Sequence, residues 1–166
     1  GERRRRLWRV DCLEGRWYLL VLSEDKPDMK NVAEQFGFPD EEPQWETRDY
    51  TPLLNRIQPQ SSWHFRLTAN PTRSSAAEAD ASGRGKVHNH GPIEQQKKWL
   101  MDRAESHGFQ LKDEDFTITF RDWNVFCKKG NKGLRVSILA VTYEGNLTVT
   151  DPERFCETLT GGIGRG

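Results

Sequence analysis

The sequence predicts an α+β fold in which helices pack against antiparallel sheets. Several short stretches alternate apolar and polar residues with a period of two, as half-buried strands do. Other stretches have helical spacing between a proline and a glycine, and short turns join successive strands. With 166 residues, the chain can form one large or two small domains.

The first sixty residues begin with a predicted β-hairpin. Leu7–Leu13 and Arg16–Leu22 are strand-like, and Glu14-Gly15 between them suits a tight two-residue turn. Because Arg16–Leu22 is nearly all apolar after its first residue, we expect it to be a central strand covered on both faces. Tyr50–Ile57 could form a short helix, and residues 59–62 then form a linker.

The middle of the chain predicts a strand, a loop and a helix. From Trp63 to Asn70 apolar and polar residues alternate, which gives a half-buried strand with a polar, basic open side. Thr72–Gly85 is rich in small residues and is expected to be a loop. Pro92 suits the start of a helix and Gly108 its C-terminal cap.

The last third predicts more strands and a second helix. Phe116, Ile118 and Phe120 alternate in a predicted strand, and we assign the aromatic residues Trp63, Trp99, Phe116 and Phe120 to the core. Strands at residues 125–127 and 134–143 flank a glycine-rich tip, and residues 146–149 extend the sheet. Asp151-Pro152 is a suitable cap and first turn for a helix that runs to residue 159.

The element order from Trp63 onward is β-α-β-β-α, one strand short of a ferredoxin-like unit. The sequence therefore predicts tandem ferredoxin-like (RRM-like) domains with antiparallel sheets, at residues 1–60 and 61–166. The chain starts without Met and stops inside a glycine-rich run. We expect a truncated reading frame, with the first domain shortened at its N-terminus and the second at its C-terminus.

Charge is unevenly distributed although the formal net charge is zero. Residues 40–49 contain five acidic residues and one arginine, whereas residues 121–135 contain five basic residues and one aspartate. A neutral total argues against a purely electrostatic nucleic-acid binder, but it is compatible with a local basic groove.

Cysteine and histidine spacing gives no metal or disulfide pattern. Cys12, Cys127 and Cys156 are odd in number and far apart, which favours a reducing compartment, expected to be the cytoplasm. His88-x-His90 is half a metal site without further ligands nearby, and either histidine could instead act in acid–base chemistry. We expect no metal, no cofactor and no membrane span, because no stretch reaches the roughly 18 apolar residues required.

Two basic or glycine-rich segments are candidate phosphate contacts. The tip with Lys128, Lys129 and Lys132 could follow a phosphate backbone, or it could be a solvated turn that protects strand ends. The run 161–166 could bring backbone amides to a phosphate, or it could simply end a helix.

Taken together, an ordered set of short motifs is similar to a known family. The motifs are Leu7-Trp8-Arg9-Val10, Leu20-Val21-Leu22-Ser23, Phe65-Arg66-Leu67-Thr68-Ala69-Asn70-Pro71, Gly85-Lys86, Trp99-Leu100, Tyr143-Glu144-Gly145, Val149-Thr150-Asp151-Pro152 and Gly162-Ile163-Gly164. The chain resembles the CasE family of CRISPR-repeat endoribonucleases of type I-E systems, in the RAMP superfamily. The resemblance extends over nearly the whole chain.

The resemblance implies a function and partners. Members bind the stem-loop of a repeat in precursor CRISPR RNA and cut without a metal at the 3′ base of the stem. The attacking 2′-hydroxyl leaves a 2′,3′-cyclic phosphate and a 5′-hydroxyl. The enzyme then stays with its product as a subunit of the Cascade complex, so repeat RNA and other Cascade subunits are the expected partners.

The resemblance also implies site residues. The groove-entering hairpin of the family falls on residues 126–135, which makes four cations the best RNA contacts: Lys128, Lys129, Lys132 and Arg135. Secondary contacts are Arg66, Arg84 and Lys86, and the glycine-rich loop adds Gly162, Gly164 and Arg165. The family's catalytic histidine is expected before Gly1, so no catalytic residue is assigned.

Two alternatives to an endonuclease remain open. A non-catalytic RNA-binding subunit of a CRISPR ribonucleoprotein would have the same fold and basic hairpin. A ferredoxin-like protein-interaction domain would have no RNA affinity.

Overall fold

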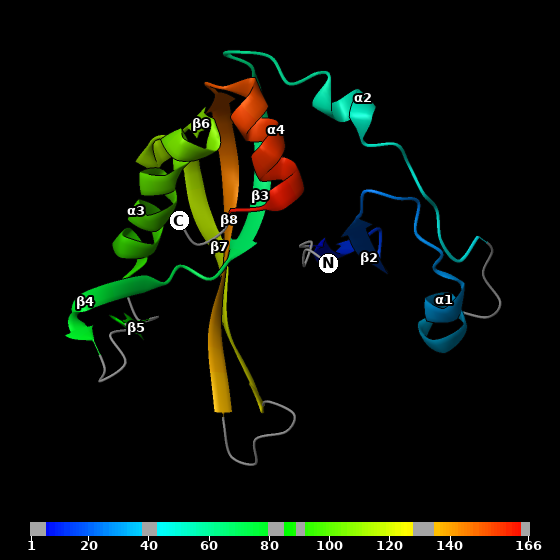
Figure 1. The fold of residues 1–166 in the computed structure, drawn as a ribbon, viewed down its shortest axis with the longest axis horizontal. Coiled ribbons are helices and arrows are strands. Elements are labelled where there is room, and N and C mark those ends of the chain that lie inside the picture. Colours follow the sequence, from blue (N-terminus) through cyan, green and yellow to red (C-terminus); the bar gives the residue numbers. More distant parts are fainter. Residues whose placement is uncertain (1–5, 38–42, 80–84, 89–91, 128–134, 164–166) are drawn as a thin grey trace. The chain divides into compact units, whose positions relative to one another are not determined.

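The computed structural model describes residues 6–37, 43–79, 85–88, 92–127 and 135–163 (Figure 1). The chain forms two compact units, one of Gly1–Ile57 with Cys156–Gly166 and one of Gln58–Phe155. Within the described ranges, none of the helices has both the length and the apolar character that crossing a bilayer requires.

The first unit begins with the predicted hairpin. Strands β1 (Leu7–Leu13) and β2 (Arg16–Leu22) pair antiparallel in full register, from Leu7 opposite Leu22 to Leu13 opposite Arg16. Glu14 and Gly15 both have positive φ, 52° and 80°, which matches the right-handed twist of a two-residue hairpin turn. The hairpin prediction is confirmed.

The environment predicted for β2 is wrong. In the described part of the chain β2 pairs with β1 alone, and side chains on both of its faces are exposed. Trp17 is 73% exposed, and Leu19 and Leu20 further along the strand are 51% and 44% exposed. An apolar strand is favoured where other elements bury both of its faces, and no described element buries both faces of β2.

The first unit also contains two short helices. Helix α1 (Lys30–Phe36) forms within a stretch that the sequence left unassigned, and α2 (Thr51–Leu54) lies inside the predicted helix. The Asp49 carboxylate accepts a hydrogen bond from the Thr51 amide at 2.9 Å, which lowers the pKa of Asp49 and fixes the start of α2.

The second unit contains a four-stranded antiparallel sheet around one long strand. Strand β8 (Arg135–Val149) pairs with β3 (Ser62–Ala69) on one edge. On its other edge it pairs with β6 (Phe109–Gln110) and β7 (Phe116–Cys127) in succession. The two segments predicted at residues 134–143 and 146–149 are therefore parts of one continuous strand.

Two helices follow the predicted boundaries. Helix α3 (Ile93–Ala104) starts after Pro92 and continues into the 3₁₀ turn η1 (Glu105–His107), which ends at Gly108 with φ 80°. Helix α4 (Pro152–Gly161) begins after Asp151, whose carboxylate accepts a hydrogen bond from the Arg154 amide at 3.2 Å. The proline, aspartate and glycine signals are confirmed.

The core of this unit lies between the helices and one face of the sheet. Tyr143 of β8 is fully buried, stacks on Trp99 of α3 and donates a hydrogen bond to the Gln96 carbonyl at 2.9 Å. Burial raises the pKa of the Tyr143 phenol. Phe155 of α4 contacts Phe109 of β6 edge-on, with ring centroids 5.8 Å apart. Both helices thus cover the same face of the sheet.

The predicted loop 72–85 is wrong. Strands β4 (Arg73–Ala79) and β5 (Gly85–His88) pair antiparallel as a separate two-stranded sheet, with a register shift between Ser75 and Ala79. Small residues carry the same backbone donors and acceptors as large ones, so a composition of alanine and serine does not prevent strand pairing.

A β-bulge in β7 overturns the assignment of Phe120 to the core. Ile118 pairs with Tyr143 and Phe120 with Thr142, so Thr119 is an extra residue in β7. Phe116 is buried, but the bulge moves Phe120 to the other face, where it is 57% exposed. The side chains of a strand alternate only while each residue has one partner.

Candidate nucleic-acid interface

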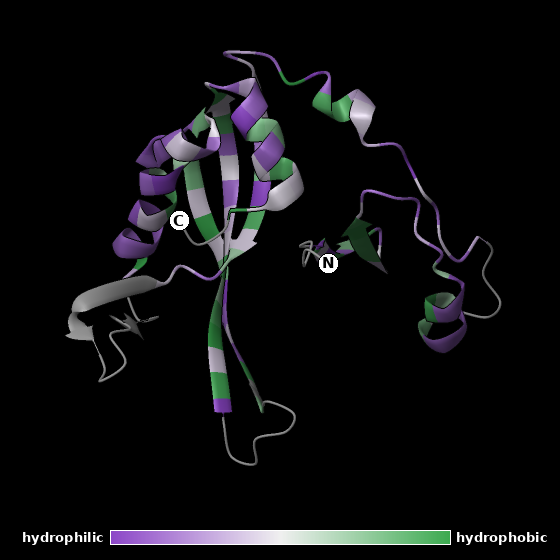
Figure 2. Cartoon of the chain, viewed as in Figure 1, coloured by the Kyte–Doolittle hydropathy of each residue, from purple (hydrophilic) through white to green (hydrophobic). Residues whose placement is uncertain are grey.

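The most prominent feature of the second unit is a two-stranded ribbon formed by the outer parts of β7 and β8. Figure 1 shows the ribbon extending beyond the helices, and Figure 2 shows that apolar residues continue along β8 into it. Its last described pair is Cys127 opposite Arg135. A two-stranded ribbon is thin enough to enter a nucleic-acid groove.

The predicted RNA contacts of this ribbon fall partly within the described residues. Arg135 is exposed at the start of β8, at the outer end of the ribbon. Lys128, Lys129 and Lys132 lie outside the described residues.

The register assigns the side chains of the ribbon to two faces. Residues paired directly across an antiparallel ladder lie on the same face. Trp123 is opposite Leu139, and Val125 is opposite Ser137, on the face that continues the buried one. Phe120, opposite Thr142, lies on the other face. Cys127 is two residues beyond Val125 in β7, so it lies on the same face as Val125 and Trp123. Arg135 is the partner of Cys127 in β8 and lies on that face as well.

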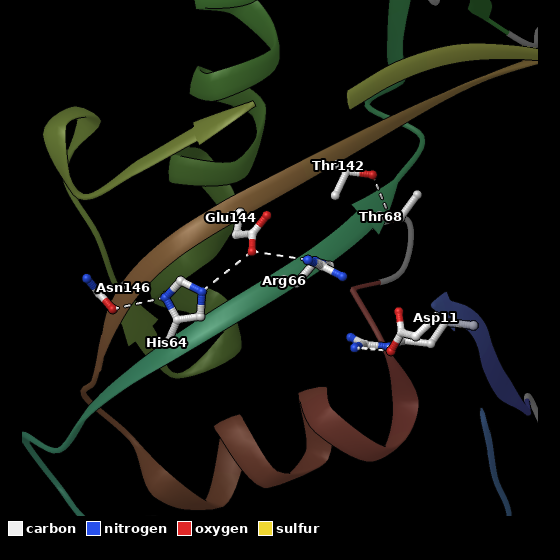
Figure 3. Close-up of polar contacts among 8 residues, drawn as sticks. Asp11, His64, Arg66, Thr68, Thr142, Glu144 and Asn146 are labelled. Atoms are coloured by element: carbon white, nitrogen blue, oxygen red, sulfur yellow. Dashed lines mark hydrogen bonds and ion pairs between the residues drawn. The ribbon is translucent and has the colours of Figure 1, made fainter. Parts of the chain in front are cut away.

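A polar cluster occupies the face of the sheet opposite the core (Figure 3). Thr68 of β3 and Thr142 of β8 share a hydrogen bond at 2.8 Å. Two residues further along each strand, Arg66 donates to Glu144 at 3.3 Å. Beyond that pair, His64 Nδ1 lies 3.4 Å from Asn146 Oδ1. We call this surface the open face, defined by His64, Arg66, Thr68, Phe120, Thr142, Glu144 and Asn146.

Glu144 is the electrostatic centre of the open face. Its carboxylate lies 3.3 Å from Arg66 Nη2 and 3.7 Å from His64 Nε2. The hydrogen bond from Arg66, more than the charges around it, holds the pKa of Glu144 below its ordinary value. The cluster therefore presents an ionised acceptor that is held by a cross-strand hydrogen bond from Arg66.

Arg66, one of the predicted RNA contacts, lies in this cluster. It is 48% exposed and takes part in the Glu144 pair, so it can offer further donors to a ligand from the same side of the sheet. Sequence alternation predicted the orientation of Arg66 correctly, since the residues of β3 are exposed and half-buried in turn.

Gly162, at the end of α4, adopts the helix-ending conformation. Its φ is 78°, and its amide donates to the Thr158 carbonyl at 2.7 Å. This backbone arrangement is the one expected of a glycine that terminates a helix. Gly164 and Arg165 lie outside the described residues, so a phosphate contact by this loop stays a prediction.

The second predicted group of cations is described only in part. Lys86 and His88 belong to β5, while Arg84 and His90 lie outside the described residues. His107 is half-buried at the end of η1, with Nδ1 2.8 Å from the Arg103 carbonyl oxygen. Across the ranges that the structure describes, no three acidic, histidine or cysteine side chains come together in a metal-binding arrangement.

Sequence reasoning missed four members of the open face: Phe120 of β7, and Thr142, Glu144 and Asn146 of β8. The alternation assigns Phe120 to the core because nothing in the sequence of β7 indicates the extra residue, and the sequence of β8 does not show which residues lie opposite β3. The alternation of β8 gives the missing signal. Its buried residues Val141, Tyr143 and Val149 fix one face, and pairing both ends of β7 against β8 leaves β7 one residue too long.

Comparisons with known proteins agree with this architecture. The family described as CRISPR associated protein matches residues 1–166. The CRISPR-associated endoribonuclease Cse3 of Thermus thermophilus is 31% identical over 177 residues, covering 99% of this chain and 75% of the relative.

Solved structures are similar over almost the whole chain. The structure of CRISPR endoribonuclease Cse3 bound to 19 nt RNA has a TM-score of 0.72 at 29% identity, and covers 98% of this chain and 74% of that one. A chain of a CRISPR RNA-guided surveillance complex has a TM-score of 0.62 at 20% identity, with 97% and 71% covered, and agrees in fold. By sequence and by structure, this chain belongs to the CRISPR associated protein family.

Proposed function

We propose that the protein is a CRISPR RNA-processing endoribonuclease. It binds the stem-loop of a CRISPR repeat and cleaves the precursor RNA at the 3′ base of the stem, giving a guide RNA that it retains. The observation that carries the proposal is the similarity, in both sequence and structure, to Cse3, an endoribonuclease whose structure was solved with RNA bound.

The proposed chemistry is an internal transesterification without a metal. The 2′-hydroxyl next to the scissile phosphate loses its proton and forms a bond to phosphorus. The 5′-oxygen of the next nucleotide leaves and takes up a proton. The products are a 2′,3′-cyclic phosphate and a 5′-hydroxyl, so no water, oxidant or other reactant is consumed. We assign neither proton transfer to a described side chain.

The β7–β8 ribbon is the proposed RNA-binding element. The major groove of an RNA duplex is deep and narrow, so a thin ribbon in it acts on shape and phosphates more than on base edges. In this role the cations at its end, Lys128, Lys129, Lys132 and Arg135, neutralise phosphates on both sides of the groove. Arg66, Arg84 and Lys86 would add further contacts, as would the loop with Gly162, Gly164 and Arg165.

The proposal extends to architecture and partners. The β3-α3-β7-β8-α4 order supports a ferredoxin-like unit at residues 61–166, and a second, partial unit at residues 1–60 completes a tandem arrangement. The proposed partners are repeat RNA and the other subunits of a Cascade complex, in the cytoplasm.

The test combines binding and cleavage of labelled repeat RNA in EDTA. The full-length gene product is compared with K128A/K129A/K132A and with a control, K26A/K30A/K112A, that removes the same charge from exposed lysines elsewhere. We expect one cut below the stem, a cyclic-phosphate end, and a loss of affinity of at least tenfold that is specific to the hairpin variant.

Other outcomes would change the conclusion. Tight binding without a cut would favour a non-catalytic RNA-binding subunit of a CRISPR complex. Cleavage that requires an added metal would contradict the proposed chemistry. Absence of binding at modest salt would remove the support for an RNA-directed function altogether.

A further inference from the structure

The starting point is the aromatic ring on the open face. Phe120 is 57% exposed and lies opposite Thr142, whose hydroxyl group is bonded to Thr68 across the sheet. The bulge at Thr119 is what turns the ring outward. Bulges of this kind re-aim a side chain at the cost of a regular ladder, which indicates a use for the ring on this face.

Hydrogen-bonding groups lie at a useful spacing from the ring. Glu144 is two residues from Thr142 along β8, about 7 Å away, and Asn146 is two residues further. Arg66 and His64 approach Glu144 from β3. A flat ligand stacked on Phe120 could therefore direct its edge toward a fixed carboxylate, a guanidinium group and an amide.

The chemistry of the open face favours unpaired bases as the ligand. Aromatic rings on open sheets stack on single bases, which offer both a π-face and an edge with donors and acceptors. Bases inside a duplex are already stacked on each other and cannot reach such a ring. A second protein sheet would require an apolar surface, whereas His64, Arg66, Glu144 and Asn146 are polar.

Charge on this face distinguishes it from the ribbon tip. Asp122 lies opposite Ala140, two residues beyond Phe120 and Thr142 on the same face, so the carboxylates of Asp122 and Glu144 outweigh the positive charge of Arg66. A phosphate backbone would therefore gain little binding free energy on the open face. Contacts to bases are favoured instead, and such contacts depend only weakly on salt.

We propose that the open face binds unpaired RNA nucleotides next to the stem, with Phe120 as the stacking ring and the Glu144 cluster as the group that hydrogen-bonds the base edges. This inference rests on the proposed function, because it assumes that a stem-loop is bound elsewhere on the same protein.

The experiment compares two RNAs, a bare repeat stem-loop and the same stem-loop with short unpaired adenosine flanks. The quantity measured is the ratio of their dissociation constants in EDTA, at low and moderate salt. The proteins are the wild type, Phe120→Leu, which keeps most of the apolar volume but removes the ring, and Phe36→Leu as a matched control at an exposed phenylalanine of α1 in the other unit. Circular dichroism checks that each variant is folded.

We expect the flanks to tighten wild-type binding about tenfold, since one stacked base contributes roughly 1–3 kcal/mol. Phe120→Leu should lose most of this gain and Phe36→Leu should keep it, while salt should leave the ratio nearly unchanged. Equal ratios for the wild type and Phe120→Leu, or a wild-type ratio of one, would overturn the inference although the stem-loop still binds. Failure to bind the bare stem-loop would overturn the proposed function, and this inference with it.

Discussion

At the residue scale, the open face is controlled by the environment of Glu144. Arg66 and His64 approach this carboxylate from the neighbouring strand. The pKa of Glu144 therefore depends on the pairing of β3 with β8 and not on β8 alone. Removing Arg66 should therefore affect the titration of a residue 78 positions away in the sequence.

Titration of Glu144 tests this coupling. We expect its pKa to lie below the ordinary glutamate value of about 4.3, and to rise toward that value in Arg66→Gln. Because the folded-state pKa is lowered, the contribution to folding is present above the unfolded-state pKa and is lost as pH falls through the folded-state pKa. Carboxyl NMR shifts measured between pH 2 and 7 would report both values.

Arg154→Gln is the matched control for this titration, since it removes a guanidinium group of the same unit that pairs with Asp151 instead. A Glu144 pKa that is equal in the wild type and in Arg66→Gln would show that the 3.3 Å pair does not persist in solution.

At the element scale, the bulge in β7 separates two phenylalanines that the sequence pattern treats alike. Phe116 is 5% exposed and contacts Phe65 and Tyr143, whereas Phe120 is 57% exposed. Their contributions to the free energy of unfolding should differ accordingly.

Alanine substitution at the two positions makes the difference measurable. Phe116→Ala should lower the free energy of unfolding by about 3–5 kcal/mol, because it leaves a cavity in the core. Phe120→Ala should change it by less than about 1 kcal/mol, since an exposed ring loses little buried area. Urea unfolding followed by near-ultraviolet circular dichroism would compare them. Equal losses would mean that β7 has no bulge.

The elements themselves were largely predictable from sequence, for local physical reasons. The turn at Glu14-Gly15, the start of α4 at Asp151-Pro152 and the end of η1 at Gly108 depend on conformations set by a few adjacent residues. The bulge was not predictable from β7 alone, because it reflects the register with β8. The β4–β5 pair was missed because small residues give no alternating signal.

At the scale of the whole molecule, the net charge of zero conceals an uneven distribution of acidic and basic residues along the chain. The acidic stretch at residues 40–49 and the basic stretch at residues 121–135 belong to different units. RNA affinity should therefore depend on salt as it does for a basic protein, although the average charge argues otherwise.

The salt dependence of repeat-RNA binding tests this expectation. The affinity should fall as salt rises, and in K128A/K129A/K132A the slope of log K against log salt should be shallower by about two to three, since each lost phosphate contact changes it by roughly 0.7–0.9. Fluorescence anisotropy at several salt concentrations measures the slope. An unchanged slope in this variant, equal to that of K26A/K30A/K112A, would place the phosphate contacts elsewhere.

The placement of the candidate site was less predictable than the fold. Alternation along β3 indicated a polar side with Arg66 on it, but the partners of that arginine come from β8 and depend on a long-range register. The domain division at residues 60 and 61 and the tandem arrangement stay predictions.

The extra residue in β7 also bears on how related genes are compared. One codon, that of Thr119, supplies the extra residue that breaks the alternation between the inner part of β7 and the outer ribbon. In-frame loss of that codon would remove the bulge and leave the pairs between β7 and β8 in place, so each side chain would keep its face while its position in the sequence shifts by one. If a related sequence lacks the extra residue, an alignment without a gap at this position would pair residues that lie on opposite faces of the ribbon. Conservation would then be assigned to the wrong face.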